Sequence, residues 1–155
     1  MKIKLIGNDE IISLLYILNE VTLDLHKKGI QQWSYPWKSS DIAYDVHEGN
    51  VYGVYDEKDL IGTFKIKEVT SLHYTCVEIP SKELSQIAVH PSAQGKNIGA
   101  YIIHYAQSHV NKLNQALYLD CWAGNEKLKT FYTLNGFNYL GDFPEEDYVY
   151  KCISI

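Results

Sequence analysis

The sequence contains no arginine, so all 14 of its basic side chains are lysines; with 19 acidic residues they give a net charge of −5. Proteins that bind nucleic acid usually present a basic face, often rich in arginine. The lysines here are scattered, and only Lys27 and Lys28 are adjacent. We therefore expect no nucleic-acid partner.

Cysteine is scarce and long apolar runs are absent. The three cysteines (Cys76, Cys121 and Cys152) are widely spaced and form no CxxC motif, which favours a reduced, cytoplasmic setting. No apolar run approaches the ~18 residues that a spanning helix needs, and residues 1–12 lack the pattern of an export signal, so we expect no membrane partner. The histidines and cysteines lack zinc-ligand spacing, so we expect no metal.

The chain has 155 residues, of which 46% are hydrophobic and 21% charged, which predicts one globular domain over residues 1–155. Period-3.6 and period-2 patterns predict the element order βααβββαβαββ. This order predicts an α/β (α+β) fold, a single mixed sheet with helices on both faces. The expected helices are 11–25, 42–48, 98–110 and 125–135, and the expected strands are 1–7, 50–55, 60–69, 83–89, 117–121, 137–140 and 148–155. Residues 71–80 show no regular pattern.

Residues 83–110 contain the most informative pattern, a strand followed by a short polar turn and a helix that begins at Ile98. Such an arrangement points the free backbone N–H groups of a helix N-terminus at an anion. The turn adds Gln94, Gly95 and Lys96, which suit a phosphate. A P-loop is excluded because His90 and Asn97 stand where Gly and Ser/Thr are needed. A dinucleotide GxGxxG is excluded because only Gly95 and Gly99 lie nearby.

This turn resembles the acetyl-coenzyme A signature of the GNAT N-acetyltransferases, Arg/Gln-x-x-Gly-x-Gly/Ala. Gln94 and Gly99 match its ends, and Asn97 replaces its middle glycine. Asn tolerates left-handed backbone better than most residues, so we expect binding to persist. A second segment, Asn125-x6-Tyr132-x3-Gly136-Phe137, is similar to another GNAT motif, and the predicted element order is also that of the family.

The resemblance implies an acetyl-CoA-dependent acyltransferase without a metal cofactor. It also implies that the strand before the turn binds pantetheine through its main chain, that the turn amides bind the pyrophosphate, and that Lys96 adds a charge or is simply solvated. The implied cofactor-binding residues are Ile87, Ala88, Val89, Gln94, Gly95, Lys96, Asn97, Ile98, Gly99, Ala100, Asn125 and Tyr132.

Direct acetyl transfer needs a neutral amine, a donor for the oxyanion and a proton for the leaving thiolate. The Val89 N–H is the candidate oxyanion donor. Tyr132 matches the family's general acid, and a phenol pKa near ~10 suits a thiolate. Glu83 is the candidate base, with Glu78 and Asp120 as rivals. We interpret Cys121 as a buried strand thiol, His90 as part of the turn and His104 as a residue of the long helix.

Residues 30–38 carry Trp33, Tyr35 and Trp37 around Pro36. These rings either fill the core or form the wall of an acceptor pocket, where they can face a cation. We take Trp33, Trp37, His73 and Tyr74 as candidate substrate-binding residues. The favoured acceptor is a small amine; a protein or peptide acceptor and a non-catalytic acyl-CoA-binding domain are the alternatives. A homodimer could form through residues 148–155 if that strand lies at an edge.

Overall fold

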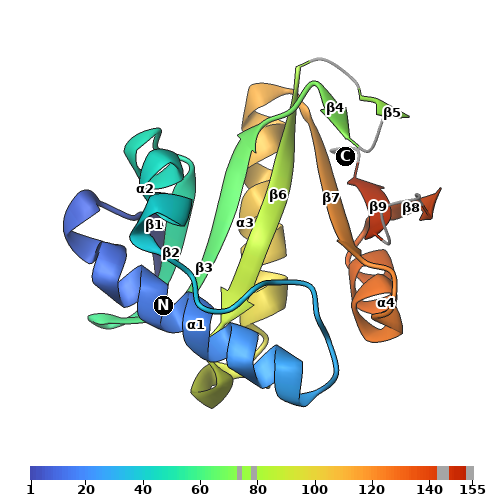
Figure 1. Cartoon of the computed structure of the whole chain (residues 1–155). Coiled ribbons are helices and arrows are strands. Elements are labelled where there is room, and N and C mark those ends of the chain that lie inside the picture. Colours follow the sequence, from blue (N-terminus) through green and yellow to red (C-terminus); the bar gives the residue numbers. More distant parts are fainter. Residues whose placement is uncertain (73–74, 78–79, 143–146, 153–155) are drawn as a thin grey trace. The chain divides into compact units, whose positions relative to one another are not determined.

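The computed structural model describes residues 1–72, 75–77, 80–142 and 147–152. The chain forms two compact units: Met1–Lys65 with Gln86–Gly99, and Ile66–Ser85 with Ala100–Ile155 (Figure 1). Two strands, β3 (Asp59–Glu68) and β6 (Ser81–Val89), contribute residues to both units. The expectation of one domain over residues 1–155 stays a prediction.

The first unit is a small sheet with strand order β1-β2-β3-β6. Strand β1 pairs antiparallel with β2, and β2 pairs antiparallel with β3 through a tight hairpin. Beyond the end of β6, the His90 N–H donates to the Ile61 carbonyl at 2.9 Å, which continues the pairing with β3. The other elements of this unit are β1 (Lys2–Leu5), η1 (Asn8–Glu10), α1 (Ile11–Lys27), α2 (Ser39–His47), β2 (Val51–Asp56) and η2 (Pro91–Ala93).

Helices α1 and α2 lie side by side in this unit (Figure 1). Their apolar residues recur every three or four positions, so each helix has one apolar face, and that face is buried. Full burial of each such side chain contributes about 1.5–3 kcal/mol to folding. The resulting core cluster consists of Ile6, Leu14, Ile17, Leu18, Val21, Ile42, Val46, Val51 and Ala88.

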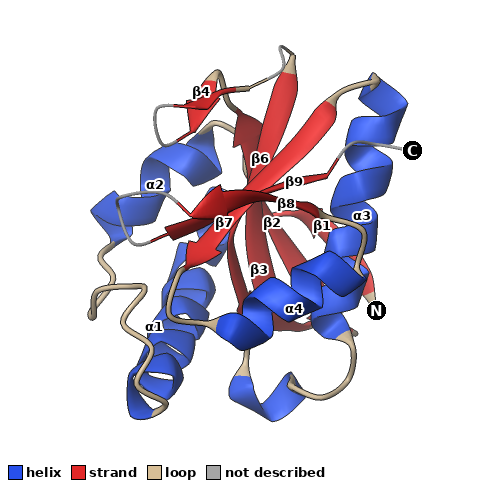
Figure 2. Cartoon of the chain, turned by 90° about the vertical axis from the view of Figure 1, so that its right-hand side faces the viewer, coloured by secondary structure: helices blue, strands red, loops and turns tan. Residues whose placement is uncertain are grey.

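The second unit has strand order β3-β6-β7-β9-β8, with β6 parallel to β7 and the pairs β7–β9 and β9–β8 antiparallel (Figure 2). The parallel pair is joined by the long helix α3, as parallel pairing requires. Gln107 of α3 donates from Nε2 to the Asn135 carbonyl at 2.9 Å, which ties α3 to the end of α4. The further elements are β4 (Ser71–Leu72), β5 (Thr75–Cys76), α3 (Ile98–Leu113), β7 (Ala116–Trp122), α4 (Glu126–Leu134), β8 (Asn138–Asp142) and β9 (Asp147–Cys152).

The predicted helices and longer strands are confirmed, with ends that differ by up to three residues. Two further observations concern segments that the sequence left open. Residues 71–80 contain the short antiparallel pair β4–β5, which is too short to produce a period-2 pattern. The C-terminal strand lies between β7 and β8, so β9 does not provide the open edge on which a strand-paired dimer depended. Within the described residues, no helix is long and apolar enough to cross a membrane.

Candidate active site

Strand β6 changes conformation at Gln86, whose φ is +51°. A left-handed non-glycine residue interrupts regular pairing, and the chain passes from the second unit to the first at this residue. Beyond it, Ala88 is 1% exposed and packs in the core of the first unit, while Ile87 and Val89 are half-buried. The strand predicted to bind pantetheine is therefore fixed to the first unit through Ala88.

The polar turn after β6 is shaped by side chains as well as by backbone. The His90 Nδ1 accepts the Ser92 N–H at 3.2 Å and caps η2, which confirms that His90 shapes the turn. Gln94 donates from Nε2 to the Val89 carbonyl at 3.3 Å. This bond holds the turn back against the end of β6, so Gln94 has a structural role that its place in the motif did not reveal.

Two residues of the turn have left-handed backbone: Gly95 has φ +83° and Asn97 has φ +60°. A Cβ added at Gly95 would meet nothing within 4 Å, so the glycine serves conformation rather than local packing within the chain. Asn97 occupies the place of the motif glycine and adopts the geometry that glycine would supply. Gln94 to Asn97 are exposed, and Ile98 begins α3, whose first amides lack intrahelical acceptors. This is the geometry of an anion site.

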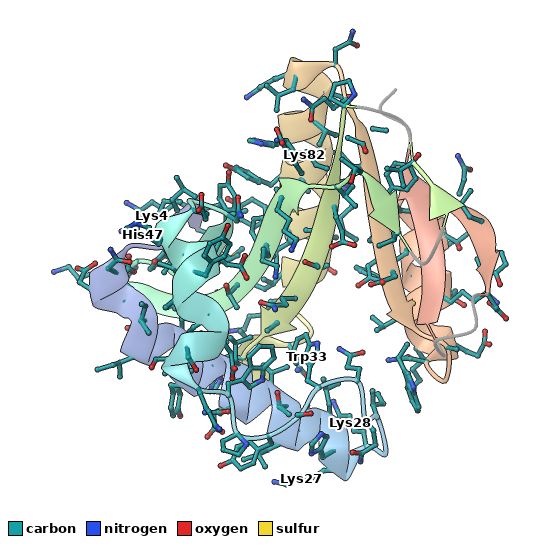
Figure 3. The ribbon with its side chains drawn as sticks, turned by 45° about the horizontal axis from the view of Figure 1, so that its top comes forward. Lys4, Lys27, Lys28, Trp33, His47 and Lys82 are labelled. Carbon is teal, nitrogen blue, oxygen red and sulfur yellow. The ribbon has the colours of Figure 1, made fainter. Side chains whose placement is uncertain are left out.

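The aromatic loop after α1 is held to that helix by three hydrogen bonds. The Trp37 N–H donates to Asn19 Oδ1 at 2.8 Å, and the Trp37 Nε1–H donates to Thr22 Oγ1 at 2.9 Å. His26 Nε2 bonds the Trp33 carbonyl at 2.8 Å. The three α1 side chains follow at intervals of three and four residues, so they lie on one side of the helix. Figure 3 shows Trp33 on the loop beyond the end of α1, where Lys27 and Lys28 lie.

Trp33 and Trp37 lie against the core and also line a surface hollow, and their expected substrate-binding role stays a prediction. They are partly buried against the core cluster that contains Ala88, and their rings meet edge to face with centroids 5.6 Å apart. They also border an open hollow of about 310 Å³, which is lined by Gln32, Trp33, Ser34, Pro36, Trp37 and Asp41. This is the lower end of the range for small-molecule sites. His73 and Tyr74, the other two candidate substrate residues, lie outside the described residues.

The second unit contains the other family-like segment. Asn125 is 9% exposed and caps α4 by accepting the Leu128 N–H at 3.2 Å. The cap uses Oδ1 and leaves the amide NH₂ as a donor group. Tyr132 lies about two turns further along α4 and is 6% exposed. Its ring centroid lies 5.5 Å from that of Phe131 and 5.8 Å from that of Phe137.

Burial raises the pKa of Tyr132 above its ordinary value, and the neighbouring Cys121 and Asp120 raise it further. A buried phenol resists becoming an anion, so Tyr132 stays protonated throughout the neutral range. That is the form in which a tyrosine donates a hydrogen bond or a proton. Cys121 is itself a buried thiol of β7, as expected.

The candidate bases differ in how the structure presents them. Glu83 lies on the first half of β6 opposite Tyr118 of β7, and both Glu83 and Asp120 are half-buried. Glu78 lies outside the described residues. His104 is exposed on α3. The hydroxyl of Ser85, two residues after Glu83, is buried and has no hydrogen-bond partner among the described residues, a feature that the sequence did not indicate.

The predicted residues thus fall into two groups. The turn, Ile87 to Val89 and the two tryptophans belong to the first unit, and Glu83, Asn125 and Tyr132 belong to the second. Asp41, in the first turn of α2, was not among the predicted site residues, because nothing in its local sequence marks it as part of a hollow. The predicted set also lacked Asn19, Thr22 and His26, although their spacing on one helix side was visible. Among the described residues, no group of His, Cys, Asp or Glu could hold a metal ion.

Comparison with known proteins agrees with this geometry. The model of the acetyltransferase (GNAT) family matches residues 17–137. The chain therefore belongs to the GNAT acetyltransferase family. It is, in particular, an acetyltransferase of the kind that takes its acetyl group from acetyl-CoA. A comparison with curated proteins finds no relative.

Several solved structures share the fold. A GNAT-family acetyltransferase from Listeria monocytogenes is 19% identical with a TM-score of 0.83, over 97% of this chain and 92% of that one. The PaiA N-acetyltransferase of Thermoplasma acidophilum, solved in complex with coenzyme A, is 15% identical with a TM-score of 0.76, over 98% of each chain. The ribosomal-protein-S18-alanine N-acetyltransferase of Escherichia coli is 15% identical with a TM-score of 0.73, over 99% of this chain and 94% of that one.

Proposed function

We propose that this protein transfers the acetyl group of acetyl-CoA directly to a primary amine of a small-molecule acceptor. The observation that supports the small acceptor is the aromatic hollow, which belongs to the same unit as the turn and is lined by Trp33 and Trp37. A hollow of about 310 Å³ suits an amine of a few carbon atoms better than an extended peptide.

The turn after β6 is the proposed binding site of the coenzyme A pyrophosphate. The amides of residues 94–100 and the positive end of the α3 dipole favour a multiply charged anion. The left-handed conformations of Gly95 and Asn97 fit this role, because consecutive N–H groups can then point toward one ligand. Lys96 is exposed on the turn and adds a positive charge. Ile87 and Val89 would bond pantetheine through their main chain, with Asn125 as a further donor.

The chemistry would use the groups that the family motif implies. The acceptor amine loses its proton to Glu83, directly or through water, and attacks the thioester carbonyl. The Val89 N–H donates to the oxygen that becomes negative, and Tyr132 gives its proton to the departing thiolate. Burial leaves the Tyr132 phenol fully protonated at neutral pH but makes it a weaker acid than an exposed phenol, so its part rests on the family motif and not on its pKa. No acyl-enzyme is needed, which leaves Cys121 without a chemical step.

A thiol-release assay across two acceptor classes tests the proposal. Purified protein and acetyl-CoA are mixed with a panel of mono- and diamines, and separately with peptides that carry free N-termini or lysines. We expect thiol release with small amines and little with peptides. Preference for a peptide would assign the protein-acceptor alternative. Tight binding of acetyl-CoA without release on any acceptor would contradict the proposed reaction.

A further inference from the structure

The six residues around the aromatic hollow have an unusual combination of chemistry. Two indole rings and a proline provide apolar walls, Gln32 and Ser34 provide neutral polar groups, and Asp41 provides the single ionisable side chain. The faces of tryptophan rings attract cations, and a carboxylate beside them strengthens that attraction. The lining residues include no basic group to oppose it. The hollow therefore has the chemistry of a site for an organic cation.

The walls of the hollow are held in place before anything binds. Trp37 is fixed at its backbone by Asn19 and at its indole by Thr22, and the Trp33 backbone is fixed by His26. Thr22 is itself fully buried and bonded to the Leu18 carbonyl, so its hydroxyl cannot turn away. A ligand that enters this hollow does not have to order the loop, and preorganisation of this kind favours binding of small groups.

The Asp41 carboxylate is oriented by a hydrogen bond to the backbone. It lies in the first turn of α2, where the helix dipole favours negative charge, and its Oδ2 accepts the Lys38 N–H at 2.7 Å. This bond uses one of about four acceptor positions on the carboxylate. Of the nearby lysines on α1, Lys28 is paired with Asp24 at 2.9 Å, which reduces its repulsion of a cation.

A site with this chemistry is poorly suited to the reacting amine itself. Transfer requires a neutral amine, whereas a carboxylate beside indole rings favours the ammonium form. A group that binds here is thus held as a cation and does not react. We propose that the Asp41–tryptophan hollow binds a second, protonated amino group of the acceptor, so that the preferred substrates are diamines or other amines with a separate cationic centre. This inference rests on the proposed function for the acceptor but concerns a binding site that can be tested alone.

The first experiment measures binding without catalysis. Tetramethylammonium serves as a cation that cannot be acetylated, tert-butanol serves as a neutral molecule of similar size, and calorimetry reports their binding. Asp41→Asn removes the charge but keeps an oxygen that can accept the Lys38 N–H, so the cap of α2 is preserved. Asp59→Asn is the matched control, since Asp59 is an exposed carboxylate in the hairpin turn of the same unit. Trp33→Leu removes a ring but leaves the backbone bond to His26.

We expect the wild type and Asp59→Asn to bind tetramethylammonium with the same Kd. Asp41→Asn and Trp33→Leu should each raise that Kd about fivefold or more. The inference would be overturned if tert-butanol bound as tightly as tetramethylammonium. It would also be overturned if Asp41→Asn and Asp59→Asn changed the Kd for tetramethylammonium equally. Should Trp33→Leu fail to fold, the two aspartate variants still decide the matter.

The second experiment separates this inference from the proposed function. In the thiol-release assay, we expect kcat/KM for 1,4-diaminobutane to exceed that for n-butylamine about tenfold, and Asp41→Asn to remove the difference through KM. Cation binding with the expected variant pattern but no turnover of any amine would refute the proposed function and leave the cation site standing. Turnover that is equal for both amines and insensitive to Asp41→Asn would refute the cation site and leave the proposed function standing.

Discussion

Asn97 allows the backbone geometry of the turn to be tested with one matched pair of substitutions. Its φ of +60° is left-handed, and the same conformation occurs at Asn114, which follows α3 with φ +57°. Both residues are exposed, so neither substitution removes a packed side chain. Asn97→Ala and Asn114→Ala therefore place the same residue in the same backbone conformation, once in the turn and once away from it.

The cost follows from the Cβ atom of alanine. A left-handed L-residue costs roughly 1–2 kcal/mol, and asparagine offsets part of this cost by local hydrogen bonding of its short side chain. We expect each alanine variant to lose about 1 kcal/mol in the free energy of unfolding, which is a fall of about 3 °C in Tm for a chain of this length. The free energy of unfolding of Asn97→Gly should stay within about 0.5 kcal/mol of wild type. Glycine removes the backbone strain, but it also raises the conformational entropy of the unfolded chain, and the two effects offset each other.

Urea and thermal unfolding measure stability, and calorimetry measures coenzyme A binding to the same samples. If the folded chain adopts the left-handed turn before coenzyme A binds, Asn97→Ala loses stability. Its Kd for coenzyme A then stays within about threefold of wild type. Asn114→Ala should show the same stability loss with no change in Kd. The reasoning fails if Asn97→Ala is as stable as wild type while Asn114→Ala is not. It also fails if Asn97→Gly weakens coenzyme A binding more than Asn97→Ala does.

Three further predictions concern buried hydroxyl groups. Tyr132→Phe should lower kcat more than it raises KM for acetyl-CoA; an unchanged kcat would remove Tyr132 from the chemistry. Because the folded-state pKa of Tyr132 is raised, the phenol ionises first in the unfolded chain. The contribution of Tyr132 to stability should therefore be level below pH ~10 and fall above it, and Tyr132→Phe should make the loss of stability above pH ~10 shallower in urea titrations. Thr22→Val leaves the Trp37 Nε1–H without its acceptor, so it should lower the free energy of unfolding by about 1 kcal/mol and raise KM for the acceptor amine. Thr22→Ser keeps the bond and serves as the control. Equal KM values in the two variants would contradict the anchoring role.

Much of the turn could be predicted because its requirements are local. A glycine, an asparagine and a proline each restrict or permit particular backbone conformations, and those limits are visible in the sequence. Asn97, whose residue type tolerates left-handed backbone, has a positive φ, and His90 shapes the turn as predicted. The same holds for the helices, whose apolar stripes match the buried faces of α1 and α2.

The features that could not be predicted depend on partners distant in the sequence. Trp37 and Thr22 are separated by 15 residues, and nothing local to either residue indicates their bond. Asp41 had a sufficient local explanation as a helix cap, which hid its place in the lining of the hollow. The position of β9 between β7 and β8 depends on pairing across the whole second unit, so its own alternating pattern could not show that it is an interior strand.

Helix α1 connects the two parts of the first unit that the proposed reaction needs. Tyr16 stacks on His90 of the turn with ring centroids 5.9 Å apart, while Asn19, Thr22 and His26 hold the aromatic loop. These four positions follow at intervals of three or four residues, so they occupy one side of the helix. The bonds to the loop include two to backbone atoms, which do not depend on the identity of the loop side chains. Substitutions at positions 32–36 can therefore change the acceptor chemistry of the hollow without altering how α1 supports the turn.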